Sequence, residues 1–356
     1  MARPIQASLD LAALKNNVAV ARRHAGGAGV LAVIKANAYG HGLLRVARTL
    51  AQVDGFALLE LDDAVRLREA GHRQRILLLE GFFRAEELAE IAHHRFTIML
   101  HAIEQVKMLK SLPAEPKIDV FLKFNTGMNR LGFSPADATR VLNDVRALPC
   151  VGKIVLATHF SDAEGARGID AQMLEFETRV ACRGYERSLA NSAAMLRFPV
   201  ACGDWVRPGL MLYGASPLQN ASAQSLDLKP AMTLKSEIIA VQQLKPGDTV
   251  GYGNLFSADR AMRIGVIACG YADGYPRHAP NGAPVLVAGT RVPLTGRVSM
   301  DMLCVDLTRV PQAGIGTTAV LWGEGLPIEE VAAAAGTVSY ELMCAVTRRV
   351  PVSETG

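Results

Sequence analysis

The sequence predicts an α/β protein, namely a TIM-type (β/α)8 barrel followed by a mostly β C-terminal domain. Short apolar runs alternate with helical patterns over residues 1–226, as in a parallel sheet covered by helices. About eight such units occur, and this number suits a closed barrel better than an open sheet. From 227 to 356 the helical spacing largely disappears, and short β-type runs lie between turns. The prediction is therefore two domains, 1–226 and 227–356.

The overall composition excludes several classes of protein. With 50% hydrophobic and 20% charged residues, the chain of 356 residues is globular and long enough for two domains. A net charge of +4, spread along the sequence, is too mild to indicate nucleic-acid binding. No apolar stretch approaches the roughly 18 residues that a membrane span needs. The first residues, MARPIQASLD, lack the apolar core of a signal peptide, so we expect a cytoplasmic protein.

The cysteines are irregularly spaced and form no CxxC pair, which argues against a zinc site and against a disulfide framework. We therefore expect no metal, and we expect reduced thiols that pack in the core. The cysteines are Cys150, Cys182, Cys202, Cys269, Cys304 and Cys344.

The expected elements follow in chain order. A short strand is expected at 5–8, and then a helix that Ser8 or Asp10 caps. The barrel strands are expected at 30–34, 56–59, 76–79, 96–100, 118–124, 154–159, 188–191 and 209–213. The helices between them are expected at 43–50, 64–70, 85–93, 103–109, 136–148 and 170–184. The second domain is expected to hold strands at 232–241, 249–250, 262–269, 284–287, 290–294, 302–307 and 318–321, and a helix at 328–335.

Polar residues recur where the barrel strands are expected to end, which is where barrel enzymes place their active sites. They are Lys35 after the first strand, Lys123 at the fifth, His159 at the sixth, and Asn191 and Ser192 at the seventh, while Arg207-Pro208-Gly209 opens the eighth. A single lysine there can be a snorkelling side chain, and a single histidine can be a structural hydrogen-bonding group. Several such residues on one rim indicate a shared function instead.

A strand-end lysine and a phosphate-binding rim together suggest pyridoxal 5′-phosphate as the cofactor. Burial favours the neutral amine of a lysine such as Lys35, and a neutral amine can attack an aldehyde to form a Schiff base. Phosphate sites of barrels usually lie beside strands seven and eight, where Ser192 and the amides of Gly209 and Leu210 fall. His159 and Arg207 are then candidates for stacking on the cofactor ring and for contacting its nitrogen.

A series of motifs then resembles a known family. In chain order they are AVIKANAYGHG (32–42), KFNTGMNRLGF (123–133), THF (158–160), ANSA (190–193), VRPG (206–209), VGYGN (250–254), GYADGYP (270–276), GRVSMDM (296–302) and SYE (339–341). With these motifs the sequence resembles the bacterial alanine racemases from end to end. The resemblance implies a barrel that holds pyridoxal phosphate, and a homodimer in which the partner's β domain completes each active site.

The resemblance also implies which residues bind the cofactor and move the proton. Lys35 would hold the cofactor and act as one base, and Tyr252 of the partner subunit would be the base on the opposite face. Arg207 would hydrogen-bond the ring nitrogen, and because arginine stays charged it would leave that nitrogen unprotonated. His159 would link Tyr252 to Arg207. The full set of implied cofactor-binding residues is Lys35, Tyr39, His159, Asn191, Ser192, Arg207, Gly209, Leu210 and Tyr340.

For the substrate, the resemblance implies a carboxylate site and an access channel. Arg130 and the backbone at Met300 would orient the carboxylate, and Lys123 corresponds to a position that is often carbamylated in the family, where the carbamate braces Arg130. Tyr271 would narrow the access channel, with Arg277, Arg297 and Asp301 near its outer layers. The sequence departs from the family at Asn125, where many relatives carry Asp, and this leaves the polar partner of Asn125 open.

Three other functions fit parts of the sequence. A barrel amino-acid decarboxylase shares the two-domain plan, but it carries an acidic or cysteine residue where this chain offers Tyr252 and Met300-Asp301. A cofactor-carrying barrel without enzymatic activity lacks the β domain. A racemase of serine or of a basic amino acid is a third alternative. The bulky Tyr271 and Tyr340 argue against it, because they favour a substrate with a small side chain. If the chain is an alanine racemase as the resemblance implies, its D-alanine would serve peptidoglycan synthesis, or the reaction would feed alanine catabolism.

Overall fold

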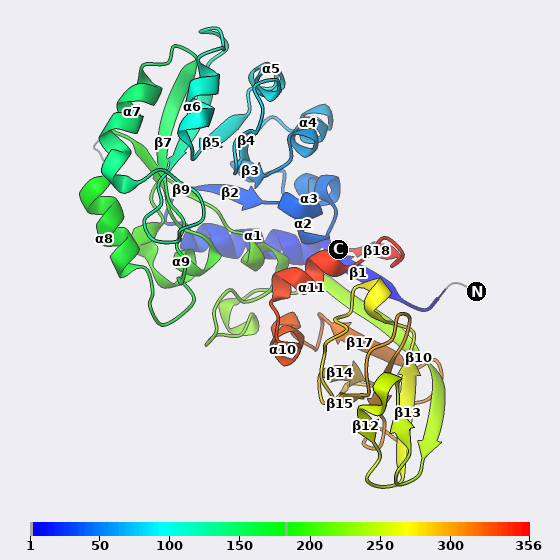
Figure 1. Ribbon diagram of the computed structural model, residues 1–356. Helices are drawn as coiled ribbons and strands as arrows, with labels where there is room; N and C mark the ends of the chain where they lie inside the picture. The colour runs from blue at the N-terminus through cyan, green and yellow to red at the C-terminus, as the bar shows by residue number, and fades with distance from the viewer. Residues whose placement is uncertain (1–2, 182–183) are drawn as a thin grey trace.

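Residues 3–181 and 184–356 are described by the structure, a computed structural model (Figure 1). Within these residues, eight parallel strands form one sheet in the order β8-β7-β6-β5-β4-β3-β2-β9. The strands are β2 (Gly29–Val33), β3 (Gly55–Leu58), β4 (Arg75–Leu78), β5 (Thr97–Leu100), β6 (Ile118–Lys123), β7 (Val151–Ala157), β8 (Glu186–Ser188) and β9 (Trp205–Val206). Backbone hydrogen bonds from Asp204 to Arg187 and from Arg207 to Ala190 join the two ends of this order. The sheet therefore closes into the expected barrel.

Helices lie outside the barrel and alternate with its strands (Figure 1). They are α1 (Leu11–His24), α3 (Leu43–Thr49), α4 (Leu61–Glu69), α5 (Glu87–His93), α6 (Ile103–Leu109), α7 (Ala138–Arg146), α8 (Asp170–Arg179) and α9 (Ser192–Arg197). Asp10 caps α1, because its carboxylate accepts a hydrogen bond from the Ala13 amide at 2.9 Å. The helix expected at 170–184 ends at Arg179, and residues 182–183 lie outside the described residues.

The expectation for the eighth barrel strand was wrong. The strand is β9, and the segment at 209–213 holds instead the 3-10 helix η3 (Leu210–Tyr213). All four residues of η3 are buried, since η3 packs against α1, and a fully buried apolar run does not distinguish a strand from a helix. The seventh strand likewise ends earlier than expected, at Ser188. As a result, Arg207-Pro208-Gly209 follows the eighth strand and lies at the carboxyl rim of the barrel.

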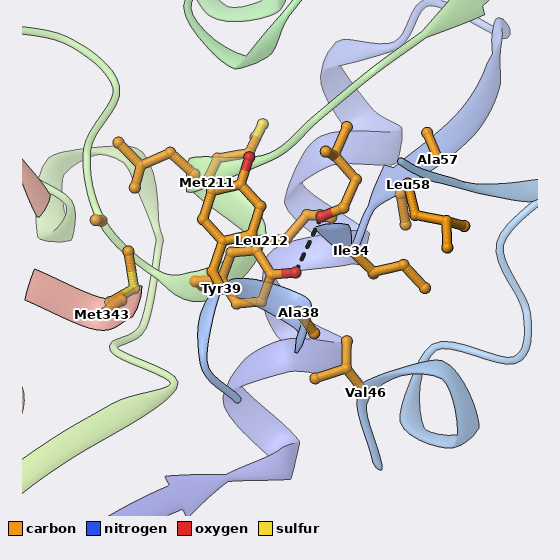
Figure 2. Close-up of a cluster of buried hydrophobic side chains, with 14 of the residues drawn as sticks. Ile34, Ala38, Tyr39, Val46, Ala57, Leu58, Met211, Leu212 and Met343 are labelled. Carbon is orange, nitrogen blue, oxygen red and sulfur yellow. Dashed lines mark hydrogen bonds between the residues drawn. The ribbon is translucent and has the colours of Figure 1, made fainter. Parts of the chain in front are cut away.

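An unexpected turn, α2 (Lys35–Tyr39), follows the first barrel strand. Ala36, Asn37, Ala38 and Tyr39 have φ values of 52°, 53°, 54° and 50°. Side-chain-bearing residues rarely adopt this left-handed conformation, because Cβ then lies too close to the following carbonyl oxygen. Packing compensates for that cost: Figure 2 shows Ala38 and Tyr39 within a buried cluster that includes Met343.

The second domain is built on another sheet, with the order β13-β16-β15-β14-β17-β10-β1-β18 within the described residues. Its strands are β1 (Gln6–Asp10), β10 (Met232–Leu244), β13 (Met262–Ile267), β14 (Pro284–Val287), β15 (Thr290–Thr295), β16 (Leu303–Asp306), β17 (Thr318–Trp322) and β18 (Val352–Thr355). A small hairpin pairs β11 (Thr249–Val250) with β12 (Phe256–Ser257). The expected β texture of this domain is confirmed, with its strands near their expected positions.

The first strand lies in this second sheet and not in the barrel. β1 pairs antiparallel with β10 and parallel with β18, in a register that sets Ala7 opposite Leu234 and Val352. Ala7 and Leu9 are buried, so one face of β1 joins the core. The domain boundary between residues 226 and 227 stays a prediction. Although β1 falls within residues 1–226, it belongs to the sheet of the second domain.

Two short helices near the end of the chain connect the domains. α10 (Ile328–Ala334) packs on β14 and β17, and α11 (Ser339–Ala345) packs on α2. Gly40 makes the second contact possible, because a Cβ at this position would lie 2.4 Å from the Met343 carbonyl oxygen. Among the described residues, no helix combines the length and the hydropathy that crossing a bilayer requires.

Candidate active site

A cavity of about 330 Å³ lies at the carboxyl ends of the barrel strands, a volume within the range of small-ligand and cofactor sites. The barrel brings together side chains that are far apart in the sequence. The sequence-predicted residues that line the cavity are Lys35, Tyr39, Lys123, Arg130, His159, Asn191, Ser192, Arg207, Gly209 and Tyr340. Leu210 is buried beside them.

Lys35 directly follows β2 and begins the left-handed turn. Ile34 before it is fully buried, whereas Lys35 is half-buried and lines the cavity. The turn is closed by hydrogen bonds: the Ala38 amide donates to the Ile34 carbonyl, and the Leu43 amide donates to the Asn37 side chain, both at 2.9 Å. The backbone around the lysine is therefore held in one conformation, as a reacting group requires.

Arg207 is the most highly connected residue of the site, and it is 5% exposed. Its Nη1 donates to the carbonyl and hydroxyl of Ser188 at 2.7 and 2.6 Å, and its Nη2 donates to the carbonyls of Thr158 and Leu189 at 2.7 and 3.2 Å. Nε has no acceptor among the described residues. Burial lowers the pKa of Arg207 to about 10, so the guanidinium stays charged at neutral pH. The Nε–H group is the donor that Arg207 can offer to a ligand.

His159 follows β7 and is neutral. Its Nδ1 lies 3.4 Å from Nη2 of Arg207, and because a guanidinium can only donate, Nδ1 is the acceptor. Burial, together with the positive charges of Arg207 and Lys123, lowers the pKa of His159 well below its usual value. The imidazole therefore carries its single proton on Nε2.

Hydroxyl and amide groups gather beside β8 and β9. The Gly209 amide donates to Oγ of Ser192 at 2.8 Å. A Cβ at Gly209 would lie 2.8 Å from Oη of Tyr39, so glycine leaves the space for this tyrosine. Asn191 lines the cavity, but its Oδ1 caps α9 by accepting a hydrogen bond from the Ala194 amide at 3.0 Å. This side of the cavity offers uncharged hydrogen-bonding groups of the kind that bind phosphate.

Three tyrosines connect the barrel to α11. The ring centroid of Tyr39 lies 4.6 Å from that of Tyr213 and 5.6 Å from that of Tyr340. The Tyr213 hydroxyl donates to the Val33 carbonyl at 2.9 Å, next to the lysine turn. Burial raises the pKa of Tyr340 to about 12 and raises that of Tyr39 strongly, so both hydroxyls are protonated donors at neutral pH.

Positive charge dominates the cavity. Lys35, Lys123, Arg130 and Arg207 line it, and Glu80 is the acidic residue among the described residues that do so. Burial, and then the charges of Arg207 and Arg130, lower the pKa of Lys123 to about 8. Such a cavity favours anionic ligands, including phosphates and carboxylates.

Asn125 has a local role. Its Oδ1 accepts hydrogen bonds from the amides of Gly127 and Asn129 at 3.2 and 2.9 Å, and its Nδ2 donates to Oδ1 of Asn129 at 3.0 Å. This identifies the partner that the sequence left open. Asn125 shapes the loop that leads to Arg130.

Tyr252, Tyr271, Met300 and Asp301 lie in the second domain and are not among the residues that line the cavity. Tyr252 is 70% exposed and Met300 is 52% exposed, values that are unusual for large apolar side chains. The structure does place three of these residues near one another, because the amides of Tyr271 and Ala272 donate to carbonyls of the 299–300 segment at 3.0 Å. Within one copy of the chain, the candidate site is therefore in two parts.

A buried ion cluster that the sequence analysis missed supports the second part. Asp273 is fully buried and pairs with Arg3 and with Arg349, each at 2.8 Å. Arg349 also binds the Asp301 carboxylate at 2.6 Å, and Arg3 donates to the Asp301 carbonyl at 2.7 Å. The motif GYADGYP contains Asp273, but both arginines lie far away in the sequence, so no local pattern indicated this cluster.

The cysteines stand apart from this chemistry. Free thiols occur at Cys150, Cys202, Cys269, Cys304 and Cys344, and Cys182 lies outside the described residues. In the part of the chain that the structure describes, no three His, Cys, Asp or Glu side chains are grouped as a metal site would need.

Comparison with known proteins gives one consistent result. The family described as "Alanine racemase, N-terminal domain" matches residues 9–217, and "Alanine racemase, C-terminal domain" matches residues 231–353. The alanine racemase of Nitrosospira multiformis is 56% identical over 353 residues, which cover 98% of this chain and 99% of that protein. That of Ralstonia nicotianae is 56% identical over 358 residues, which cover 99% of this chain and 96% of that protein.

Solved structures agree with the sequence relatives. The crystal structure of biosynthetic alanine racemase from Pseudomonas aeruginosa has a TM-score of 0.95 at 44% identity, covering 99% of this chain and 100% of that one. Alanine racemase from Acinetobacter baumannii has a TM-score of 0.92 at 35% identity, with 99% and 100% covered.

The barrel, its strand-end lysine and the β domain define the class of barrel-type, pyridoxal-phosphate-dependent amino-acid racemases. Within that class, the chain belongs to the alanine racemase family. Its activity is the interconversion of L- and D-alanine.

Proposed function

We propose that the chain racemises alanine by a two-base mechanism, with pyridoxal 5′-phosphate held at Lys35 and the second base supplied by a partner subunit. The observation that carries this proposal is the position of Lys35, a primary amine on a fixed turn in a cavity rich in positive charge. When bound, pyridoxal phosphate supplies an electron sink for negative charge at the substrate α-carbon. The chain's own residues do the remaining work.

The cofactor phosphate would be held beside β8 and β9. The hydroxyls of Ser192, Tyr39 and Tyr340 and the backbone at Gly209 and Leu210 are the proposed donors. Tyr39 and Tyr340 fit this role because burial keeps their hydroxyls protonated.

The cofactor ring would lie against His159 and Arg207, with Asn191 holding the start of the adjacent helix α9. Arg207 would donate its free Nε–H to the ring nitrogen. Because a guanidinium cannot give up its proton at neutral pH, the nitrogen would stay unprotonated, which weakens the electron sink and suppresses transamination. Arg207→Glu should therefore raise the ratio of transamination to racemisation, and an unchanged ratio would contradict this role.

The substrate carboxylate would be oriented by Arg130. We propose that Lys123 is carbamylated and that the carbamate pairs with Arg130, replacing a repelling positive charge by an attractive negative one. A pKa of about 8 supports this, because carbamylation requires the neutral amine.

The second base would be Tyr252 of the partner subunit, in a homodimer. Its 70% exposure and its position outside the cavity support this arrangement, since the lysine-lined cavity of one copy offers no tyrosine from that loop. The phenol oxygen of the partner's tyrosine would then accept a hydrogen bond from Nε2 of His159, whose Nδ1 accepts from Arg207. Tyr271, Met300 and Asp301 would approach with Tyr252 and narrow the access channel.

We also propose that the enzyme works in the cytoplasm, where the free thiols of the described cysteines stay reduced. D-alanine for peptidoglycan is the favoured role, because the Pseudomonas aeruginosa relative is named a biosynthetic alanine racemase. Alanine catabolism is the alternative role for the same reaction.

The test incubates purified protein with pyridoxal phosphate and L-alanine in deuterium oxide. D-alanine is measured by chiral chromatography, and α-deuteration by proton NMR. Lys35→Ala should lower both by about 10³-fold or more, because it removes the cofactor anchor and one base. Lys117→Ala is the matched control, since Lys117 is exposed and distant from the cavity. Full activity of Lys35→Ala, or equal losses in the two variants, would contradict the proposal.

A further inference from the structure

A second charged hollow lies at the opposite end of the barrel from the active site. It measures about 410 Å³ and is formed where β4, β5 and β6 begin, with Arg75, Thr97 and Asp119 in its wall. The loops that precede β4 and β5 complete the wall with Arg73 and Arg95. This end of a barrel does not carry the catalytic residues, so the hollow is separate from the site described above.

Positive charge in this hollow exceeds what its acidic neighbours can balance. Arg68, Arg73, Arg75 and Arg95 line it, and Asp119 is the carboxylate among the described lining residues. Asp119 is already used, because it pairs with Arg75 at 3.1 Å and accepts the Lys153 amide at 2.9 Å. Glu90, on the neighbouring surface, is 3.2 Å from His94. Four arginines therefore share one carboxylate.

Arg68 is held in place without a carboxylate partner. It donates to the carbonyls of His94, His72 and Gln74 at 3.1, 2.9 and 2.8 Å, and it lies over the Phe96 ring at 5.4 Å. Burial, and then the charge of Arg73, lower the pKa of Arg68. Its positive charge is thus fixed and uncompensated, which costs free energy unless an anion is near.

Arg75 supplies an independent observation. Its side chain is 15% exposed, and its guanidinium lies over the Trp205 ring at 4.5 Å. Nη2 pairs with Asp119, but Nη1 is buried and has no acceptor among the described residues. Because Nη1 is closed to solvent, Arg75 adds positive charge to the wall of the hollow, and direct contact with an anion would fall to the other arginines.

We propose that this hollow binds a small phosphate-type dianion. Planar guanidinium groups match phosphate oxygens, and several arginines with no carboxylates of their own form a site of that chemistry. Arg73 and Arg95 are exposed and carry no ion pair among the described residues. Arg73 donates one hydrogen bond, from Nη1 to the Arg68 carbonyl at 3.2 Å, and its remaining donors can turn toward an anion. The dianion would neutralise the charge that Arg68 and Arg75 hold inside.

The test uses enzyme loaded with pyridoxal phosphate and freed of excess cofactor, so that the phosphate-binding groups of the active site are already occupied and no free cofactor competes for the hollow. Isothermal titration with inorganic phosphate and with pyrophosphate, at constant ionic strength, should show saturable binding of one anion per chain. The double variant Arg73→Gln/Arg95→Gln should bind about tenfold or more weakly, because two cationic donors are lost. Racemase activity should be unchanged, since neither residue belongs to the catalytic cavity.

Lys245→Gln/Arg309→Gln is the charge-matched control, because it also removes two positive charges and both residues are exposed in the second domain. Equal weakening in this control would mean general electrostatic screening, and the proposal would be overturned. No saturable binding by the cofactor-loaded wild type would overturn it as well. Retained binding in the double variant would place the anion elsewhere and reject this hollow.

Discussion

At the scale of single residues, the protein keeps buried histidines neutral. His41 is fully buried, its Nδ1 hydrogen-bonds the Tyr39 carbonyl at 2.9 Å, and its Nε2 has no partner among the described residues. Since a carbonyl can only accept, Nδ1 carries the proton. Burial lowers the pKa of His41 to about 4. Protonation of this residue must therefore oppose folding.

The free energy of unfolding should fall as the pH decreases from 6.5 to 4. The unfolded chain binds a proton at His41 in this window while the folded chain does not, and the shift corresponds to about 3 kcal/mol at most. Urea unfolding at pH 7.5 and pH 5 measures this. His41→Phe should lose less stability between the two pH values than the wild type, and equal losses would show that His41 does not titrate on unfolding.

The chemistry of Lys123 should also depend on pH, but in a higher range than the stability effect of His41. Its pKa of about 8 means that the neutral amine, and with it the proposed carbamate, increases as the pH rises from 6.5 to 8.5. Protein in ¹³C-labelled bicarbonate should give a carbamate carbon signal that grows over this range. The signal should be absent from Lys123→Gln, whose KM for alanine should rise. A signal of equal size in Lys123→Gln would assign it to another amine.

The residues of the cavity could largely be predicted, whereas their contacts could not. Strand-end position marked Lys35, His159 and Ser192, because a barrel turns sequence periodicity into one shared rim. The cap formed by Asn191 and the Asx turn of Asn125 depend on loop dihedrals, which apolar periodicity does not encode. The roles that the family resemblance gives to these residues stay predictions.

At the scale of elements, the turn at 35–39 combines strain with position. A left-handed conformation costs roughly 1–2 kcal/mol for each residue that bears a Cβ. Ala36→Val should therefore lower the free energy of unfolding by about 2 kcal/mol, because a β-branched residue fits φ of 52° poorly. Ala36→Gly should be close to neutral, because relief of strain offsets the greater freedom of the unfolded chain.

Chemical denaturation of the two Ala36 variants tests this prediction. Ala12→Val, at an exposed position in the first turn of α1, gives the cost of valine on ordinary backbone. An equal cost at both positions would show that the turn stores no strain. Racemase activity should fall in Ala36→Val, because this variant also disturbs the placement of Lys35. It should change little in Ala36→Gly.

The elements themselves show where sequence reading succeeds. Six barrel strands, β2 to β7, could be located because each contains a buried apolar run between helices of clear periodicity. The seventh, β8, is a polar segment that overlaps its expected range only at Ser188. The prediction of β9 was wrong because a strand of two residues shows no hydrophobic periodicity, and the sequence of the buried η3 next to it resembles that of a strand. The turn α2 was not predicted because its left-handed residues are Ala, Asn and Tyr, and none of them is the glycine that usually marks this conformation in a sequence.

The Asp273 cluster ties separate elements together. Asp273→Asn would leave two arginines without their buried partner, so we expect a loss of about 3 kcal/mol in the free energy of unfolding. The loops that carry Tyr271 and Asp301 should loosen, which should raise KM more than it lowers kcat. Asp259→Asn, which removes an exposed carboxylate, is the control and should change stability little. A similar effect of the two variants would contradict a structural role for the cluster.

At the scale of the whole molecule, Lys35 lies in the barrel cavity and Tyr252 lies outside it, in the second domain. This separation makes the proposed sharing of the active site between two subunits testable. Lys35→Ala and Tyr252→Phe should each abolish activity. A mixture of the two, allowed to exchange subunits, should recover up to about a quarter of wild-type activity, because half of the dimers are mixed and each has one intact site. Coupled activity assays after dissociation and reassociation measure this. Persistent inactivity of a verified mixed dimer would show that both bases act within one subunit.

The pairing of β1 with β18 has a consequence for the order of folding. During synthesis, the barrel sequence leaves the ribosome before either neighbour of β1 exists, so β1 has neither β10 nor β18 to pair with while the barrel folds. Contacts between Ala7 and Val352 close a loop that contains the barrel, and such contacts form late because they are distant along the chain. The second sheet is therefore completed last, when β18 pairs with β1. A nascent chain stopped before β18 would contain a folded barrel and a second sheet in which one edge of β1 is unpaired.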